Sequence, residues 1–391
     1  MNSDLPAPVG PSGRMSRQWL IITLSLSFGI FVGGLAAGGE LERLAIAGAE
    51  SLPFMALALL AYLGAGRPWV RVLALLWLLA ILLVYSLANV LYGYALLFPP
   101  LPDGTETAIN SDAGASLRML GIVAGGALSL MVGFAFLFRP VRLAFSRFLP
   151  IDPDSFVHTV ALVAVVGVTL TSFVPLLVLS QPPLLAMQDP QGGGTGPLSM
   201  GRDAWGMLRD DLYGLVWMIP ASVVAVGFGI RRDLRAALDR LGLVRPTWRQ
   251  VGVGLAVGVS LVAGANLLDM GTQWLWDTMG WPVTNQVAVE RLMGYTLSPV
   301  GAVVVGVSAG LGEELAVRGV LQPRLGLLLS NLFFTGLHAL QYNWDALVTV
   351  FVLGLVFGLV RNRTNTTTSA ITHGSYDFLL TIGSVLQIPG F

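Results

Sequence analysis

The segment from residue 306 to residue 318, GVSAGLGEELAVR, carries three charged side chains in a stretch that is otherwise apolar enough to lie in a bilayer. A charged residue near the middle of a membrane helix costs roughly 2.5–3.5 kcal/mol on insertion scales. Left unpaired, Glu313, Glu314 and Arg318 would together cost about 8–10 kcal/mol, enough to threaten insertion of the helix. Since ionisable residues inside a membrane mark candidate functional sites, we expect other groups to stabilise these charges.

Helix geometry separates the two glutamates. Glu314 and Arg318 are four residues apart, share a face in the favoured acid-before-base order, and can form a pair that removes much of the insertion cost. Glu313 is rotated by about 100° from Glu314 and has no charged partner on its own helix. We therefore expect Glu313 to face a neighbouring helix or a wet cavity.

Two of the three histidines follow this segment inside further predicted helices. Phe334 and His338 are four residues apart, as are His373 and Asp377, so each pair shares a helix face. A single pair of this kind could serve only to hold helices together by hydrogen bonds. The whole set instead favours a site, because it gathers imidazoles and carboxylates in a few neighbouring helices. The remaining histidine, His158, has no acidic or ligand-type partner at helical spacing and is expected to be structural or interfacial.

Two other protease chemistries are alternatives. Residues 306–310 match the pattern G-x-S-x-G, but a nucleophile elbow requires a strand–turn–helix, whereas Ser308 lies in a predicted membrane helix. A rhomboid-like pair of Ser308 with a histidine stays open as a minor alternative. A protease with two catalytic aspartates is disfavoured, because Asp269 and Asp377 lack the flanking motif; Asp269 is expected to be an interfacial cap or hydrogen-bond partner.

The composition identifies the class of protein. Of the 391 residues, 54% are hydrophobic and 11% are charged, whereas soluble domains carry about 25% charged residues. The chain is therefore expected to be an integral membrane protein. The lack of cysteine excludes disulfides, Cys-ligated zinc and a thiol nucleophile. All 22 basic residues are arginine, which excludes lysine-dependent nucleotide loops and Schiff-base chemistry. We expect no nucleotide or nucleic-acid partner, since 22 acidic residues balance the arginines.

The elements that must position these side chains are membrane helices. Since about 20 apolar residues suffice to span a bilayer, the apolar runs predict an all-α polytopic membrane protein with about eleven helices. Their expected positions are near residues 19–37, 47–65, 73–98, 116–138, 156–180, 212–230, 250–275, 298–320, 325–342, 345–361 and 368–388. Glycines at 306, 310 and 312 would let a neighbouring helix pack closely against the glutamate helix.

The arginines predict how these helices are oriented. With the N-terminus inside, cytoplasmic segments hold 16 arginines and outer segments hold five, which leaves Arg318 within its helix. The positive-inside rule then predicts a cytoplasmic N-terminus and an outer C-terminus. The Gly-rich loop 181–211 is expected to be flexible and extracytoplasmic. The basic segment 231–249 is expected to be a cytoplasmic linker between an N-terminal region of about six helices (1–230) and a C-terminal module of about five (241–391).

Three short motifs in order carry a resemblance to a known family. EELAVR, FTGLH and HGSYD match the EExxxR, FxxxH and HxxxN/D motifs of the CAAX-protease and bacteriocin-processing family, also called CPBP or Abi. The resemblance covers roughly residues 241–388, whereas residues 1–230 show none. It implies a CPBP-type helical core and an intramembrane peptidase, here expected in a bacterial cytoplasmic membrane.

The resemblance also implies a role for each matching residue. Glu313 would be the general base that activates a water, and His338 would help to position and polarise that water. Glu314 and Arg318 would form a supporting pair, and Phe334 would pack beside His338.

His373 and Asp377 would sit where the family stabilises the developing oxyanion. This sequence departs from the family pattern there, because asparagine is frequent at the position of Asp377 and an ionised aspartate would repel an oxyanion. Asp377 is either protonated or orients His373 as an acceptor.

These residues leave open whether the protein binds a metal. Glu313, His338 and His373 could supply a His₂Glu set for a divalent metal such as zinc. The family is also argued to use a glutamate-activated water without metal, and this sequence lacks HExxH.

The expected substrate is a membrane-associated protein or peptide in the lipid bilayer. The rival hypothesis is a non-catalytic scaffold or a proton-coupled transporter that retains the family fold, since buried Glu and His residues are common in proton relays. Against a transporter, the first third of the chain has no matching polar set, which inverted repeats would predict.

Overall fold

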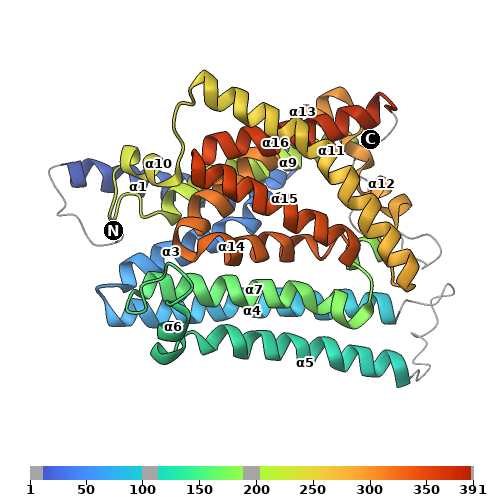
Figure 1. The fold of residues 1–391 in the computed structure, drawn as a ribbon. Helices are drawn as coiled ribbons and strands as arrows, with labels where there is room; N and C mark the ends of the chain where they lie inside the picture. Colours follow the sequence, from blue (N-terminus) through green and yellow to red (C-terminus); the bar gives the residue numbers. More distant parts are fainter. Residues whose placement is uncertain (1–11, 99–112, 188–202, 389–391) are drawn as a thin grey trace.

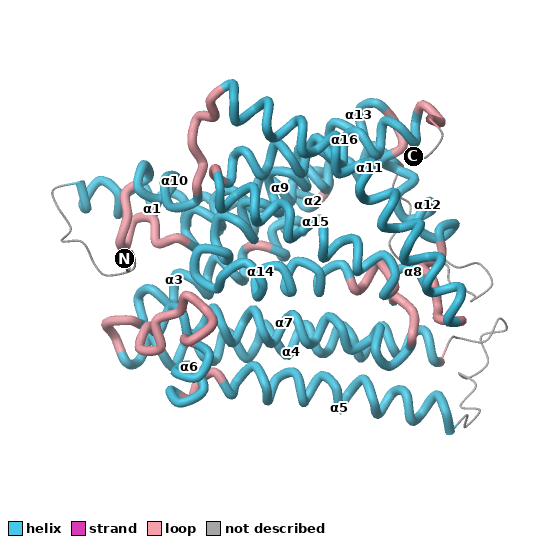
Figure 2. Tube along the Cα trace, viewed as in Figure 1, coloured by secondary structure: helices cyan, strands magenta, loops and turns pink. Residues whose placement is uncertain are grey.

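The computed structural model describes residues 12–98, 113–187 and 203–388, and its long elements are all helices (Figures 1 and 2). The helices of the N-terminal region are α1 (Ser12–Ala37), α2 (Gly39–Ala47), α3 (Leu52–Gly64), α4 (Pro68–Leu97), α5 (Ala113–Ala135), α6 (Arg139–Phe145), α7 (Phe156–Leu179), α8 (Pro183–Ala186) and α9 (Ala204–Ala225). Those that follow are α10 (Leu234–Leu241), α11 (Trp248–Met279), α12 (Gln286–Met293), α13 (Pro299–Val307), α14 (Gln322–His338), α15 (Trp344–Arg363) and α16 (Thr366–Val385). About half of the predicted loop 181–211, from residue 188 to residue 202, lies outside the described residues.

The all-α polytopic class is confirmed, but the predicted number of eleven spans is not. In the described residues, seven helices are long and apolar enough to cross a membrane, or eight if the bent pair of α2 and α3 is one span. Helices α9 and α16 occupy predicted positions but fall outside this criterion. The predicted helices 298–320 and 325–342 are joined in one apolar helical stretch from Pro299 to His338.

That stretch of 40 residues folds back on itself at Gly326. In a straight helix, Arg318 and Phe334 would lie about 24 Å apart, given the rise of about 1.5 Å per residue. The Arg318 guanidinium instead lies 4.4 Å from the centre of the Phe334 ring. Gly326 makes the reversal with φ +79°, a left-handed conformation that favours glycine. The segment therefore consists of two neighbouring arms, which brings the predicted site residues of both arms together.

The turns around the glutamates are π-helical. The first arm continues from α13 through η5 (Ser308–Glu313) and η6 (Leu315–Leu321), both of which are π-helices. π-Helical turns are rare in proteins, and many of those that occur lie at functional sites. The α-helical geometry expected for residues 298–320 therefore holds only for the beginning of this segment.

Glycines allow α16 to approach the first arm closely. This arm, residues 299–321, carries both glutamates and is called the glutamate arm. A Cβ built on Gly310 would lie 2.6 Å from Cα of Gly374, and one built on Gly306 would lie 2.7 Å from the Gly374 carbonyl oxygen. No side chain larger than hydrogen fits there without moving the backbone. The expectation of close helix packing is met at Gly306 and Gly310, whereas Gly312 faces Leu215 of α9 instead.

The N-terminal region and the C-terminal module share their hydrophobic cores. Leu325 of α14 belongs to the core built by α3, α4 and α7, and α7 lies directly beneath α14 in Figure 1. Leu315 and Leu241 pack in a second core with residues of α1, α3 and α9. The buried guanidinium of Arg324 donates to the hydroxyl of Tyr62 in α3 and to the carbonyl of Ala225. The glutamate arm is thus held between the two regions.

Candidate active site

Glu314 lies at the centre of a buried polar cluster. Its side chain is 0% exposed, and its Oε1 is 3.0 Å from Nη1 of Arg318, the pair that the spacing of four residues predicts. The same oxygen is 3.0 Å from Nδ1 of His373. The hydroxyl of Ser369 donates to Oε2 at 2.6 Å. Three groups from two segments therefore converge on one carboxylate, which fixes α16 against the glutamate arm.

Arg318 is enclosed by groups that complement its charge. Besides Glu314, its guanidinium donates from Nη2 to the carbonyl of Gly354 in α15 at 2.9 Å. It also lies over the rings of Phe334 and Phe357, at 4.4 Å and 5.5 Å from their centres. Aromatic faces attract a cation most strongly where water is excluded. These contacts stabilise a charge that would be costly if left unpaired in the membrane.

His373 lies between carboxylates. Its Nδ1 faces Glu314, and its Nε2 is 3.3 Å from Oδ2 of Asp377 and 4.0 Å from Oε2 of Glu313. Its ring stacks on Phe357, with centres 4.2 Å apart and an angle of 20° between the planes. A histidine can donate from both nitrogens only when it carries two protons. The arrangement therefore favours the imidazolium form of His373, with Asp377 as an acceptor beside it.

Glu313 has the opposite environment from its neighbour. Its side chain is 39% exposed, and it lines a cavity of ≈ 630 Å³ together with His338, His373 and Asp377. The expectation that Glu313 faces a cavity while Glu314 pairs with Arg318 agrees with this geometry.

His338 presents one nitrogen to the same cavity. Its Nδ1 lies 2.9 Å from the carbonyl of Phe334; a carbonyl only accepts, so this nitrogen carries the proton and leaves Nε2 as an acceptor. The rings of Phe334 and His338 are in contact, with centres 4.7 Å apart. Phe334 thus orients His338 through both its ring and its backbone.

A second cavity is lined in part by the same residues. It measures ≈ 280 Å³ and shares His338, His373 and Asp377 with the first. Asp269 also lines it and accepts a hydrogen bond from Thr349 at 2.5 Å, in keeping with the role expected for Asp269. The candidate site therefore lies at the junction of two cavities.

The described residues do not assemble a metal-ligand set. No group of three His, Asp or Glu side chains in these ranges is arranged to hold a metal ion. Glu313, His338 and His373 line one cavity, but both nitrogens of His373 face carboxylates. In this conformation His373 has no nitrogen directed to a shared ion with the other two.

The other candidates from the sequence lie in different settings. Ser308 lines the large cavity, but its hydroxyl donates to the carbonyl of Val305 at 3.4 Å and belongs to a helix, not to a strand–turn–helix. His158 is buried at the start of α7, where its Nδ1 accepts from the backbone of Asp152 at 2.8 Å. That position is structural and separate from the cavity.

Two residues that the sequence analysis did not single out join the site. Ser369 bonds to Glu314 and also donates to the carbonyl of Phe357 at 2.8 Å. Tyr342 lines both cavities and stacks on His338, with ring centres 6.1 Å apart and planes 8° apart. Spacing of four residues, from Ser369 to His373 and from His338 to Tyr342, was a signal that could have identified both.

The N-terminal region also contributes to the site. Glu50 of η1 (Gly48–Glu50) and Asp210 and Asp211 of α9 line the large cavity. The hydroxyl of Tyr295, which follows α12, donates to Asp211 at 3.2 Å. None of these residues lies in a recognisable motif, because they meet only through tertiary packing.

Residues 296–379 match a family model described as type II CAAX prenyl endopeptidase Rce1-like. This segment is similar to a CAAX protease domain. The match contains all the residues that converge on Glu314 and confirms the resemblance that the three motifs carry. No curated protein and no solved structure matches the chain.

Proposed function

We propose that the chain is an intramembrane endopeptidase that hydrolyses a peptide bond of a membrane-associated protein or peptide, with Glu313 as the base that activates water. The Rce1-like match supports a CAAX-type intramembrane endopeptidase in general. The observation that carries the finer assignment is the contrast within the glutamate pair. Glu313 is partly exposed to the large cavity, whereas Glu314 is fully buried and already has three partners.

In the proposed reaction, a carboxylate oxygen of Glu313 takes a proton from a water in the cavity. The water oxygen then bonds to the carbonyl carbon of the scissile peptide. Glu313 returns the proton to the leaving nitrogen as the C–N bond breaks. His338 assists by accepting a hydrogen bond from the water at Nε2, because its Nδ1 is held by Phe334.

The tetrahedral intermediate carries a negative charge that needs donors. His373 presents its Nε2–H close to Glu313, and as an imidazolium it would favour a nearby oxyanion. An ionised Asp377 can accept hydrogen bonds but cannot donate them. Its proposed role is therefore to orient His373, not to bind the oxyanion. The hydroxyl of Tyr342 makes no hydrogen bond within the described part of the chain, which leaves it available to donate to the substrate.

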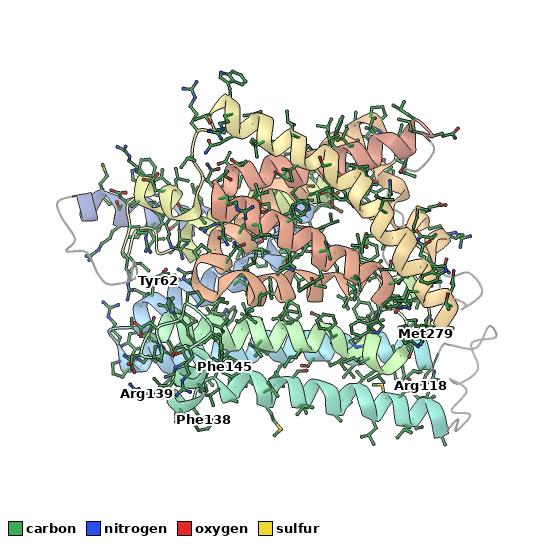
Figure 3. The ribbon with its side chains drawn as sticks, in the orientation of Figure 1. Tyr62, Arg118, Phe138, Arg139, Phe145 and Met279 are labelled. Carbon is green, nitrogen blue, oxygen red and sulfur yellow. The ribbon has the colours of Figure 1, made fainter. Side chains whose placement is uncertain are left out.

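The proposed location is a bacterial cytoplasmic membrane with the N-terminus inside. Arg118 lies near the start of α5, and Arg139, the first residue of α6, lies just past the other end of α5 (Figure 3). The two arginines mark opposite faces of the bundle. The face of Arg139 also carries Arg142, which is hydrogen-bonded to the turn after α5. By the positive-inside rule the arginine-rich face is cytoplasmic.

The test compares cells that produce the wild-type chain with cells that produce Glu313→Gln. Mass spectrometry of new peptide termini in membrane and medium fractions should find cleavage products that disappear in the variant, because loss of a general base typically lowers rates by about 10²–10⁴. Glu42→Gln, on an exposed part of α2, is the matched control and should retain them. Identical termini in Glu313→Gln would refute the proposal. Proton-driven uptake by the purified chain in liposomes, without cleavage, would support the transporter instead.

A further inference from the structure

The large cavity runs from the candidate catalytic residues toward one particular face of the molecule. Glu313 and His338 line one part of it, and Glu50, Asp210 and Asp211 line another. Asp211 lies seven residues after the start of α9, about 10 Å from that end by the helical rise. Tyr295, its hydrogen-bond partner, lies four residues before the start of α13. The cavity thus extends toward the face where α9 and α13 begin.

The side chains along this part of the cavity suit a water-filled mouth. Glu50 is exposed, and Asp210, Asp211 and Tyr295 are only partly buried. Charged groups in such positions need water or ionic partners. A hydrolase buried in a membrane must receive water from one side, and this chain of polar groups leads from the membrane face to Glu313.

The same face is poor in arginine. Helices α4 and α7 end there and α5 begins there (Figure 1). Arg118 marks it in Figure 3, and Arg139 marks the other. The opposite face holds the segments between α3 and α4, between α5 and α7, and around α10, which carry Arg67, three arginines from Arg139 to Arg147 and five from Arg231 to Arg245. The distribution makes the face with the cavity mouth extracytoplasmic.

We infer that substrate enters the cavity from the extracytoplasmic face, so that the site acts on segments of membrane-anchored or secreted polypeptides that lie outside the cytoplasm. This inference rests on the proposed function for the cleavage itself, whereas the direction of access rests on the cavity and the arginines alone. A cytoplasmic protein with a processed C-terminal tail could not reach the mouth. The inferred substrates therefore differ from the CAAX prenyl proteins after which the matched family is named.

The lack of cysteine allows a direct test with single cysteines. Ser308→Cys and Ala309→Cys place a thiol in the cavity with little change in volume, and both positions are partly exposed. Arg235→Cys places one at an exposed position of α10 on the opposite face. Each variant is treated with a membrane-impermeant maleimide, once in intact cells and once in inverted membrane vesicles, with the cysteine-free chain as the blank.

The cavity thiols should react in intact cells, and Arg235→Cys should react only in inverted vesicles. If the two cavity thiols react only in inverted vesicles, or from neither side while both variants elute as folded protein, the inference is wrong. Labelling does not require cleavage, so a failure here is distinguishable from inactivity of the Glu313 site. If Glu313→Gln abolishes cleavage and the cavity thiols label only from the cytoplasmic side, the proposed function stands and only the direction of access falls.

Discussion

At the scale of single residues, two adjacent glutamates have separate roles because their surroundings differ. Glu314 is fully buried and shares its oxygens among Arg318, His373 and Ser369. Glu313, one residue earlier, is 39% exposed to a cavity. A carboxylate that is saturated with donors is poorly suited to take a proton from water. In the proposed reaction the unsaturated carboxylate of Glu313 is therefore the base, and the saturated one of Glu314 is assigned to support.

This division predicts opposite effects of two substitutions. Glu314→Ala would leave the buried guanidinium of Arg318 without its carboxylate, which typically destabilises a protein by about 3–5 kcal/mol. Glu313→Ala should leave the thermal midpoint of the purified protein nearly unchanged, although it abolishes cleavage. Thermal unfolding of both variants in the same detergent measures the difference. Equal losses of stability would contradict the assignment of the support role to Glu314.

Tyr342 offers a second prediction at this scale. Burial, and then the negative charges of Asp377 and Glu313, raise the pKa of Tyr342 to about 12, so its hydroxyl keeps its proton at neutral pH and can donate. Removing one donor from an oxyanion site typically lowers kcat by about 10²–10³. Tyr342→Phe should therefore lower kcat with little change in KM.

The control for Tyr342→Phe is Tyr94→Phe, which alters an exposed ring of α4 outside both cavities. Initial rates on a cleavage product found by terminus mapping give kcat and KM for each variant. An unchanged kcat in Tyr342→Phe would remove the hydroxyl from the proposed mechanism.

At the scale of elements, the contact between α16 and the glutamate arm sets the geometry of the site. A methyl group at Gly310 would lie 2.6 Å from Cα of Gly374, and a backbone atom cannot swing aside as a long side chain can. Gly310→Ala should therefore displace α16 together with His373. Misplacing reacting groups by about 1 Å can cost about 100-fold in rate.

Gly264→Ala is the matched control, since nothing lies within 4 Å of a Cβ at Gly264 in α11. Gly310→Ala should have a lower cleavage rate and a lower thermal midpoint than the wild-type chain. Gly264→Ala should match the wild-type chain in both measurements. If Gly310→Ala is as active as the control, the close contact does not position the site.

The helices and the charged pair could be predicted from the sequence, whereas the number of spans could not. Long apolar runs locate helices because length and hydropathy are local properties. Helix α16 falls below the span criterion because it is rich in threonine and serine, and Ser369 and His373 of that helix bind Glu314. The polar groups that build the site thus lower the signal that reveals a membrane helix. The π-helical winding of residues 308–321 depends on tertiary packing and leaves no periodic trace.

At the scale of the whole molecule, the residues of the N-terminal region that line the large cavity could not be predicted from the sequence. The motifs lie in residues 313–377, and the family match covers residues 296–379. Glu50 and Asp211 line the same cavity from the N-terminal region, for which the sequence offered no resemblance. Which helices meet across 100 residues or more is decided by shape complementarity, not by local pattern. The N-terminal helices therefore belong to the site as structural partners.

The shared cores predict that the C-terminal module does not fold alone. Expression of residues 241–391 would expose Leu315 and Leu325, which are buried against helices α1 to α9. The truncated chain should fail to accumulate in membranes, and co-production of residues 1–230 should restore it. Accumulation and cleavage by the isolated module would show that the two regions are independent domains.

A single substitution tests the same coupling within the intact chain. Arg324 is 4% exposed, and its protein partners across the boundary are the hydroxyl of Tyr62 and the carbonyl of Ala225. Tyr62→Phe removes an acceptor from a buried cation, which typically costs about 1–3 kcal/mol. Its thermal midpoint should fall while Tyr94→Phe, at an exposed position of α4, retains the wild-type value. If both tyrosine variants unfold at the wild-type temperature, Arg324 does not couple the two regions, and the hydrophobic cores alone hold the glutamate arm in place.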